Sequence, residues 1–307
     1  MVEVVTPRLE IRGLGKAFGG TLALSGVDLA IGPGEVHALL GENGAGKSTL
    51  TKIVSGVLRA DAGTLALDGQ PFSPRSPAEA RRAGVAIVHQ EPAVCPHLSV
   101  AENVMLGREP ARFGWVDRPR LRDEARRALE WVAPEFSPDA AMSELGPADV
   151  QLVTLARALA HANCRLLILD EPTSSLAAPE VERLFAVVRR LAESGVAVLY
   201  ISHFLEEVLR IADRYSVLRD GRQVGSGEIA AATASALVEL MAGHALEERR
   251  RAEARTVGQV VLSARDLAGA RLPVSASFEL RQGEVLGIAG LVGSGRSELL
   301  RAIFGLD

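Results

Sequence analysis

Short runs of Val, Ile, Leu and Ala recur along the chain, and each run ends at glycine or at polar residues. The clearest are "EVHALL" at Glu35–Leu40, "GVAIVHQE" from Gly84, "CRLLILDE" from Cys164 and "VAVLYISH" from Val196. Apolar runs of this length are typical of buried strands. Stretches with helical character lie between them, such as "RPRLRDEARRALEWV" at Arg118–Val132. The pattern predicts an α/β fold with a buried sheet.

The first of these runs leads directly into a glycine-rich loop and then into the helical stretch "LTKIVSGVL". The loop "GENGAGKST" has the spacing G-x-x-x-x-G-K-[ST] of a phosphate-binding loop. Its glycines let backbone N–H groups turn toward a phosphate, and the helix that follows adds the positive end of its dipole. A plain glycine-rich turn is the alternative, but the strand–loop–helix context favours binding of a nucleoside triphosphate. The candidate residues are Gly41, Glu42, Asn43, Gly44, Ala45, Gly46, Lys47, Ser48 and Thr49.

Within this loop, two side chains have separate roles. Lys47 is placed to bridge the β- and γ-phosphates, and the hydroxyl of Ser48 is a ligand for Mg²⁺.

Polar residues end three other strand-like runs: Gln90, the pair Asp170–Glu171, and His203. Asp170 can order Mg²⁺ through its water shell, and Glu171 can orient and deprotonate an attacking water. A structural histidine and an acidic turn after a core strand are the simpler alternatives. Because ligands bind at the carboxyl edge of such sheets, we expect these groups to face the phosphate-binding loop.

Composition restricts the class of protein. The chain of 307 residues is 48% hydrophobic and has a net charge of -4. No apolar run approaches the ~20 residues that a membrane helix needs, and no signal peptide is recognisable. The cysteines, Cys95 and Cys164, are far apart, so we expect reduced thiols. We therefore expect a soluble cytosolic protein that does not bind nucleic acid.

With these residues in place, the chain resembles the ATP-binding cassette (ABC) ATPases. Lys47 matches the Walker A lysine, Gln90 the Q-loop, and Asp170–Glu171 the Walker B acid and the catalytic glutamate, while His203 matches the switch histidine. The resemblance implies ATP and Mg²⁺ as cofactors and a catalytic set of Glu171, His203 and Gln90. It implies a Mg²⁺ site formed by Ser48, Gln90 and Asp170.

Two further segments match the family less completely. Phe18, in "KAFGGTLAL", falls where the family has an aromatic that stacks on adenine, although packing in a β-subdomain core is the alternative. The D-loop is expected in "SSLAAPE", with Ser175 and Leu176 in contact with the partner site. Ala177 replaces the aspartate common in the superfamily.

A finer resemblance covers essentially the whole chain. The segment Val88–Glu109 and the stretches "GWVDRPRL", "YISHFLEEV" and "LRDGRQV" resemble ATPases of bacterial monosaccharide importers of the ribose, galactose and xylose type. Those proteins carry two cassettes on one polypeptide. The resemblance implies integral-membrane permease subunits and a second cassette as partners, with a periplasmic or lipid-anchored sugar-binding protein acting indirectly. It also implies a position on the cytoplasmic face of the bacterial inner membrane.

An internal repeat supports the tandem arrangement. "GEVHALLGENGAGKSTL" recurs as "GEVLGIAGLVGSGRSEL", and "LEIRGL" recurs as "LSARDL". We expect a first cassette at 1–245, a linker at 246–258 and the start of a second cassette at 259–307. This suggests a fragment of a longer tandem; a short protein with a packed tail is the alternative. The second, degenerate loop contains Gly290, Gly293, Gly295, Arg296 and Ser297.

The signature sequence of the first cassette also departs from the family pattern LSGGQ. It is expected at "LGPAD", which comprises Leu145, Gly146, Pro147, Ala148 and Asp149. Gly146 lacks the serine hydroxyl, and Pro147 lacks a backbone donor. A loop before a helix starting near Asp149 would fit equally well. In a sandwich of two cassettes this signature would face the loop that carries Arg296, so both departures would fall in one degenerate site.

Taken together, we expect a P-loop α/β core with an N-terminal antiparallel β-subdomain and a helical insertion at about 92–146. The expected function is ATP hydrolysis that powers import of a monosaccharide. Two alternatives are a nucleotide-gated interaction module with little hydrolysis and a non-transport ABC ATPase that acts on DNA or ribosomes.

Overall fold

The computed structural model describes residues 6–90, 93–160, 164–243, 257–269, 271–290 and 293–306. The chain divides into two compact units, Met1–Ala245 and Leu246–Asp307, and each is described by itself. Most of the expected linker, residues 246–256, lies outside the described residues, as does the expected start of the helical insertion at Pro92.

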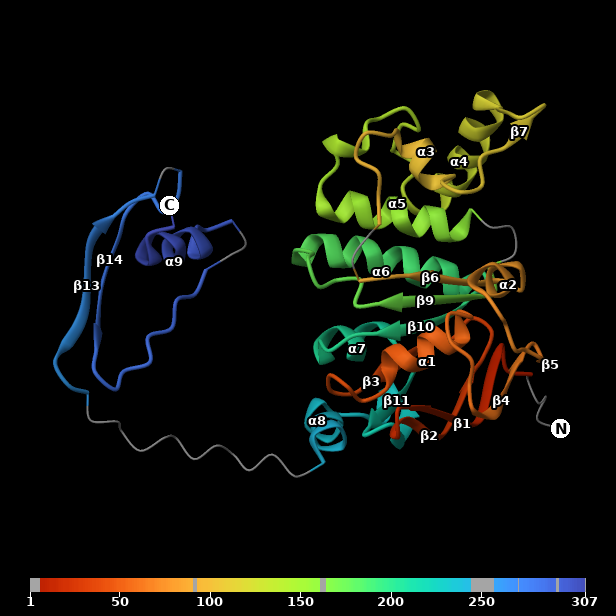
Figure 1. Ribbon diagram of the computed structural model, residues 1–307, viewed down its shortest axis with the longest axis horizontal. Coiled ribbons are helices and arrows are strands. Elements are labelled where there is room, and N and C mark those ends of the chain that lie inside the picture. Colours follow the sequence, from red (N-terminus) through yellow and green to blue (C-terminus); the bar gives the residue numbers. More distant parts are fainter. Residues whose placement is uncertain are drawn as a thin grey trace. The chain divides into compact units, whose positions relative to one another are not determined.

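A six-stranded sheet forms the centre of the first unit (Figure 1). Its order is β12-β11-β3-β10-β9-β6, and all neighbours are parallel except the antiparallel pair β11 and β12. The strands are β3 (Val36–Leu40), β6 (Val85–Val88), β9 (Leu166–Asp170), β10 (Ala197–Ile201), β11 (Arg214–Arg219) and β12 (Arg222–Glu228). The α/β fold expected from the apolar runs is confirmed.

An antiparallel sheet of four strands, in the order β2-β1-β4-β5, forms the N-terminal part of the same unit. Its strands are β1 (Leu9–Phe18), β2 (Thr21–Ile31), β4 (Ala62–Leu67) and β5 (Gln70–Pro71). Alternate residues of β1, including Leu9 and Ile11, are buried, as expected for a sheet with one face in the core. The expected antiparallel β-subdomain is therefore present.

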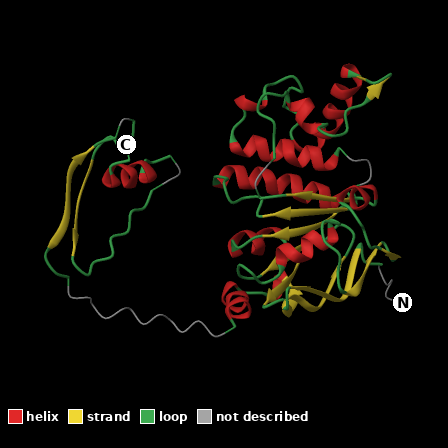
Figure 2. Cartoon of the chain, in the orientation of Figure 1, coloured by secondary structure: helices red, strands yellow, loops and turns green. Residues whose placement is uncertain are grey.

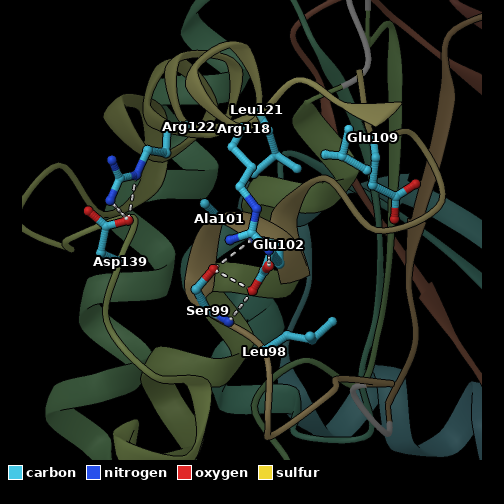
Figure 3. Close-up of a pocket in the computed structure, with 10 residues that line it drawn as sticks. Leu98, Ser99, Ala101, Glu102, Glu109, Arg118, Leu121, Arg122 and Asp139 are labelled. Carbon is cyan, nitrogen blue, oxygen red and sulfur yellow. Dashed lines mark hydrogen bonds and ion pairs between the residues drawn. The ribbon is translucent and has the colours of Figure 1, made fainter. Parts of the chain in front are cut away.

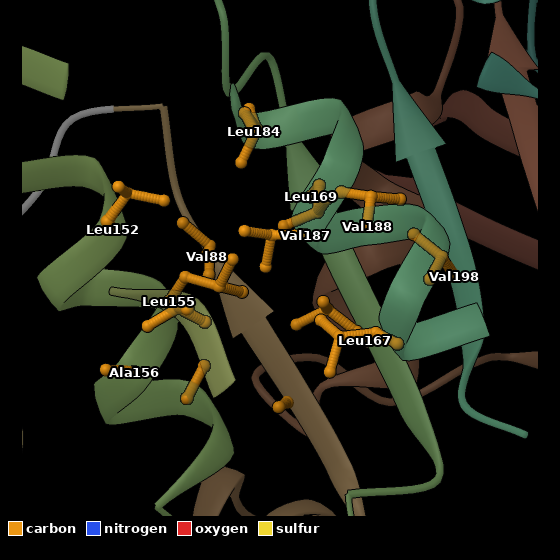
Figure 4. Packing of buried hydrophobic residues seen from close by; sticks show 14 of the residues in the cluster. Val88, Leu152, Leu155, Ala156, Leu167, Leu169, Leu184, Val187, Val188 and Val198 are labelled. Carbon is orange, nitrogen blue, oxygen red and sulfur yellow. The ribbon is translucent and has the colours of Figure 1, made fainter. Parts of the chain in front are cut away.

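Helices cover both faces of the central sheet. Successive residues of its strands point to opposite sides, and since these residues are apolar, both faces must be shielded from water. Leu167 and Leu169 of β9 belong to one hydrophobic cluster, whereas Leu166 and Ile168 belong to another. Figure 4 shows the first cluster, in which side chains of α5 and α6 meet those of the sheet. The second cluster joins α1 to the N-terminal sheet. The other helices of the first unit, apart from those of the helical subdomain described next, are α1 (Lys47–Val54), α2 (Pro77–Arg82), α6 (Ala178–Glu193), α7 (Leu205–Ile211) and α8 (Ala234–Ala242).

Between β6 and β9 the chain forms a helical subdomain, which is yellow to light green in Figure 1 and whose helices are red in Figure 2. The expected insertion contains α3 and α4, and α5 begins directly after it and packs against both. Helix α5 starts at Pro147 rather than near Asp149, because proline fits the first turn of a helix. The elements of the helical subdomain are α3 (Val100–Val104), β7 (Ala111–Arg112), β8 (Trp115–Val116), α4 (Arg118–Val132), a 3-10 turn at Met142–Glu144 and α5 (Pro147–Leu159).

A cavity of about 500 Å³, lined by both charged and apolar side chains, lies in this subdomain (Figure 3). At its wall, Ser99 and Glu102 form a capping box at the start of α3, and Arg122 pairs with Asp139. Its charged groups are therefore mostly engaged with one another, and its lining includes none of the site residues predicted from the sequence.

The second unit contains an antiparallel hairpin, β13 (Val260–Leu267) and β14 (Ala276–Arg281), followed by α9 (Arg296–Phe304). These elements correspond to β1, β2 and α1 of the first unit. The counterpart of β3, at 285–289, is not a strand, and Val285 is 79% exposed. In the first unit β3 is held between β10 and β11, and the described residues of the second unit contain no equivalent of either. Strand formation here thus depends on neighbours rather than on local sequence.

Among the residues described, we find no helix with the length and apolar character required to cross a membrane.

We expect Leu169→Ala to lower the free energy of unfolding by about 2–5 kcal/mol, because the change leaves a cavity between the sheet and α6. Leu169 is 1% exposed. Urea unfolding followed by circular dichroism measures the change. Leu22→Ala is the matched control, since Leu22 is 60% exposed and its truncation should cost far less. Equal losses for the two variants would contradict this account of the core.

Candidate nucleotide-binding site

The register of the parallel strands brings their carboxyl ends to one edge of the sheet. Ile201 of β10 lies opposite Asp170 of β9 and Leu39 of β3, and Val88 of β6 lies opposite Leu169. A cleft of about 630 Å³ opens near this edge. It is lined by Gly41, Glu42, Asn43, Gln90, Glu171, His203 and Met241. The structure thus brings the start of the glycine-rich loop together with the polar groups that were predicted to face it.

The glycine-rich loop needs its glycines for two physical reasons. Gly41, Gly44 and Gly46 all have positive φ, at 148°, 84° and 106°, which other residues rarely adopt. In addition, a Cβ at Gly41 would lie 2.3 Å from the Leu218 carbonyl oxygen, and one at Gly46 would lie 2.7 Å from that of Ala23. The loop is therefore wedged between the end of β11 and strand β2.

Directly after this loop, α1 starts at Lys47 with Gly46 as its N-cap. No side chain caps this end, and its first turn contains no acidic residue. The N–H groups of the first turn and the positive end of the helix dipole are thus available to an anion. Ser48 and Thr49 lie in this turn, so their hydroxyls are close to any phosphate bound there.

The Lys47 side chain folds back over its own loop. Its Nζ donates to the carbonyl oxygens of Gly41 at 2.6 Å and Glu42 at 3.0 Å. Burial lowers the pKa of Lys47, and the charges of Glu171 and Asp170 oppose this shift. A phosphate that displaced the two carbonyl oxygens would contact an ammonium group that is already partly desolvated and directed into the loop.

The three residues predicted to be catalytic meet at the Glu171 carboxylate. One oxygen accepts a hydrogen bond from Gln90 Nε2 at 3.0 Å, and the other lies 3.2 Å from His203 Nδ1. The Glu171 backbone has φ 48°, and its N–H donates to the Ile201 carbonyl oxygen at 2.9 Å. A left-handed conformation costs a non-glycine residue about 1 kcal/mol or more, so its surroundings must hold it.

Next to Glu171, Asp170 occupies the end of β9. Burial raises the pKa of Asp170, the Glu171 charge raises it further, and His89 and Lys47 act in the opposite direction. Across the described ranges, no group of three or more His, Cys, Asp or Glu side chains is arranged to hold a metal. One carboxylate with a few neutral oxygens nevertheless fits Mg²⁺, which commonly takes one or two carboxylates and completes its shell with phosphates and water.

Phe18 lies where β1 turns into β2, and the residue is 47% exposed. The Lys16 Nζ lies 5.5 Å from the ring centre. The exposure argues against core packing as the reason for this aromatic. Because β2 approaches Gly46 closely, the hairpin that carries Phe18 is beside the phosphate-binding loop.

The predicted signature residues lie at the start of α5, in the helical subdomain. Gly146 is the N-cap and provides no side-chain cap, and Asp149 pairs with Arg183 of α6 at 2.9 Å. None of the described residues that line the cleft comes from Leu145–Asp149. The structure therefore does not bring this segment to the cleft of its own unit.

The predicted D-loop follows Glu171 and leads into α6. Leu176 is partly buried against the core, and its N–H donates to the Thr173 carbonyl oxygen at 3.0 Å. Ser175 is exposed. Ala177 is the N-cap of α6, and the Glu180 carboxylate accepts its N–H at 2.7 Å.

Sequence reasoning missed two features of the site. Met241 of α8 lines the cleft although nothing in the pattern of "ASALVELMAGH" marks it. Thr173 is bonded to Glu207 of α7, which ties the turn after β9 to a helix far along the chain. The residue types in "DEPT" and "FLEEV" could have drawn attention, but their pairing depends on tertiary structure.

In the second unit, the described glycines of the degenerate loop share only part of the backbone conformation of the first loop, because Gly290, the counterpart of Gly41, lacks its positive φ. Gly293 and Gly295 have φ 80° and 88°, as their counterparts Gly44 and Gly46 do at 84° and 106°. Gly295 is the N-cap of α9, and Arg296 is its first residue, followed by Ser297. A Cβ at Gly290 would lie 2.4 Å from Ser294 Oγ. The two loops therefore differ in the backbone at their first glycine, in the side chain at the lysine position, and in the acidic Glu298 of the first helical turn.

Comparison with known sequences agrees with this geometry. The family model described as "ABC transporter" matches residues 24–174. "Ribose import ATP-binding protein RbsA 1" of Rubrobacter xylanophilus is 51% identical over 304 residues, which are 98% of this chain and 60% of the relative. "Putative ribose/galactose/methyl galactoside import ATP-binding protein 1" of Burkholderia ambifaria is 46% identical over 97% of this chain and 58% of its own length. The chain thus spans about three fifths of these curated relatives.

Solved structures support the fold. An ATP-binding cassette of an ABC transporter in its ADP conformation is 27% identical, with a TM-score of 0.69 over 78% of this chain and 99% of the other. A nucleotide-free cassette is 26% identical, with a TM-score of 0.67 over 77% of this chain and 95% of the other.

We expect Lys47→Ala to weaken ATP binding by about tenfold or more, because it removes a charge-assisted contact to the phosphates. Lys52→Ala is the matched control, since Lys52 is on the same helix but exposed. Binding of a fluorescent ATP analogue measures both variants. Equal affinities for Lys47→Ala and the wild type would contradict the assignment of the loop.

We expect Asp170→Asn to raise the melting temperature of the nucleotide-free chain at neutral pH. The raised pKa means that folding disfavours the Asp170 carboxylate, so removal of the charge stabilises the fold. The gain should be full above the raised pKa and should shrink as the pH falls through it. Thermal melts across an acid-to-neutral series test this. Asp61→Asn is the control of opposite sign, because Lys16 lowers the pKa of Asp61.

Proposed function

Because the chain belongs to the ATP-binding proteins of the ABC transporter family, we propose that it hydrolyses ATP to drive the import of a sugar through a membrane permease. The observation that carries the proposal is the meeting of Gln90 and His203 at Glu171, at the mouth of the phosphate-binding loop. A nucleotide-binding module without hydrolysis would not require a carboxylate held from both sides at this position.

In the proposed mechanism, the N–H groups of the loop and of the α1 N-terminus bind the phosphates, and Lys47 bridges the β- and γ-phosphates. Phe18 stacks on the adenine. Ser48, Asp170 and Gln90 would hold Mg²⁺, which supplies positive charge against the phosphate oxygens. Glu171 orients the attacking water and accepts its proton.

The remaining side chains around Glu171 position it for this step. Gln90 donates to one of its oxygens, and His203 lies against the other. With both oxygens engaged, rotation of the carboxylate is restricted, and the water is offered a single orientation. Proton transfer to a carboxylate held in this way typically contributes 10²–10⁴-fold to the rate.

A sugar is proposed as the transported solute because the relatives are named as ribose or galactose import proteins and match almost the whole chain. The proposed partners are integral-membrane permease subunits, a second cassette and, indirectly, a periplasmic or lipid-anchored sugar-binding protein. The protein would then act at the cytoplasmic face of a bacterial inner membrane.

We also propose that the two units are cassettes of one tandem. Residues 1–245 form the first cassette, 246–258 the linker and 259–307 the start of the second. In the closed sandwich, the Leu145–Asp149 signature would face the loop with Arg296, and the D-loop residues Ser175 and Leu176 would contact the partner site. One composite site then hydrolyses ATP at Glu171. The other, degenerate site binds nucleotide without hydrolysis or only holds the two cassettes together.

We expect Glu171→Gln to abolish ATP hydrolysis and sugar uptake while ATP binding persists, because the amide cannot accept the proton of the attacking water. The full-length protein is assembled with its permease in vesicles, and phosphate release and sugar uptake are measured. Arg296→Ala is the comparison in the second loop and should leave most hydrolysis intact. Transport that survived the first change and was lost with the second would reverse the assignment of the two sites.

A further inference from the structure

A cluster of hydroxyl and carboxyl groups lies behind the proposed catalytic residues, and the mechanism above does not use it. Glu207 Oε2 accepts hydrogen bonds from Thr173 Oγ1 at 2.6 Å and from the Tyr200 hydroxyl at 3.0 Å. Thr173 is 3% exposed and Tyr200 is 0% exposed. Burial and the nearby Glu207 charge raise the pKa of Tyr200, so the phenol remains a donor.

The charge of Glu207 is stabilised by these two hydroxyls rather than by a cation. None of the ion pairs found within the described ranges involves Glu207. A partly buried carboxylate without a cationic partner is costly unless its hydrogen bonds are well made. The arrangement therefore calls for an explanation beyond packing.

The three residues come from the segments that carry the proposed catalytic groups. Thr173 follows Glu171 by two positions, in the turn after β9. Tyr200 precedes Ile201, whose carbonyl oxygen accepts the Glu171 N–H at 2.9 Å. Glu207 is in the first turn of α7, which begins two residues after His203. A single carboxylate oxygen thus joins β10, the turn after β9 and the start of α7.

These bonds close a ring of contacts around the site. Glu171 contacts His203 directly at 3.2 Å, and the Thr173 and Glu207 side chains form the second link between the same two segments. The His203 side chain is 50% exposed, so packing alone does not place it. The φ of 48° at Glu171 likewise needs external support. The Glu207 link supplies a fixed distance between both backbones.

From this geometry we infer that Glu207 is a positioning residue for ATP hydrolysis: it holds the turn that carries Glu171 against the start of α7 that carries His203. The inference rests on the proposed function. In this role Glu207 does not need to contact the nucleotide. Loss of the link would let Glu171 and His203 separate, and a misplacement of about 1 Å at a reacting group can cost on the order of 10²-fold in rate.

The test measures ATP hydrolysis by the full-length protein assembled with its permease in vesicles. We expect Glu207→Leu to lower kcat by about tenfold or more with KM for ATP nearly unchanged, because the loss falls on the chemical step and not on binding. Glu207→Gln should recover part of the rate, since its amide oxygen can still accept from Thr173 and Tyr200. Glu206→Gln is the matched control: Glu206 is the exposed neighbour in the same turn.

A second measurement separates positioning from a general loss of structure. In a His203→Ala background, Glu207→Leu should cost little more, because the contact that it positions is already absent. Thr173→Val should reproduce part of the effect of Glu207→Leu, and the two together should be less than additive. Full additivity in the His203→Ala background, or a rise in KM that accounts for the whole loss, would overturn the inference.

The outcomes also distinguish the inference from the proposed function. A wild-type protein without sugar-stimulated hydrolysis would overturn the proposed function itself. A wild-type protein that hydrolyses ATP normally, with Glu207→Leu equal to it, would overturn only the role of Glu207. A variant that melts well below Glu206→Gln and binds a fluorescent ATP analogue poorly would show that Glu207 serves the fold and would also overturn the inference.

Discussion

The parallel register between β9 and β10 is the constraint on which the site depends. Because Ile201 lies opposite Asp170, the two strands end at the same level. The Glu171 N–H then meets the Ile201 carbonyl oxygen, and His203 reaches the Glu171 carboxylate from the neighbouring strand end. A shift of one residue would turn Asp170 to the other face of the sheet and break both contacts. The same shift would carry Leu167 and Leu166 to each other's side of the sheet and disturb the packing of both hydrophobic clusters.

The sequence was sufficient to predict the central strands and the residues at their ends. Short continuous apolar runs such as "LLILD", bounded by polar residues, are typical of strands covered on both faces, and β9 and β10 form as expected. The glycine-rich loop was equally clear, because its spacing requires the positive φ that Gly44 and Gly46 show. These features depend on local chemistry and burial, which periodicity reports well.

Other features depend on partners that are remote in sequence. The pairing of Thr173 with Glu207 requires two elements to meet, and Met241 reaches the cleft because α8 packs against β11 and α7. The segment at 285–289 shows the same dependence in reverse. It occupies the place of β3 in the repeat, with Val285 matching Val36, yet it forms no strand, since the described part of its unit contains no equivalents of β10 and β11. A strong local pattern is therefore necessary here but not sufficient.

The wedging of the phosphate-binding loop has a consequence for synthesis of the protein. The Gly221 N–H donates to the Ala45 carbonyl oxygen, and the Ser25 N–H donates to the Gly221 carbonyl oxygen. The turn after β11 therefore connects the phosphate-binding loop to β2 through hydrogen bonds. A ribosome finishes the loop long before it reaches Gly221. The nascent loop must wait for most of the first unit before it acquires its final support. Nucleotide thus cannot assist the earliest stages of folding, and ATP affinity becomes a late marker that the first unit has been completed.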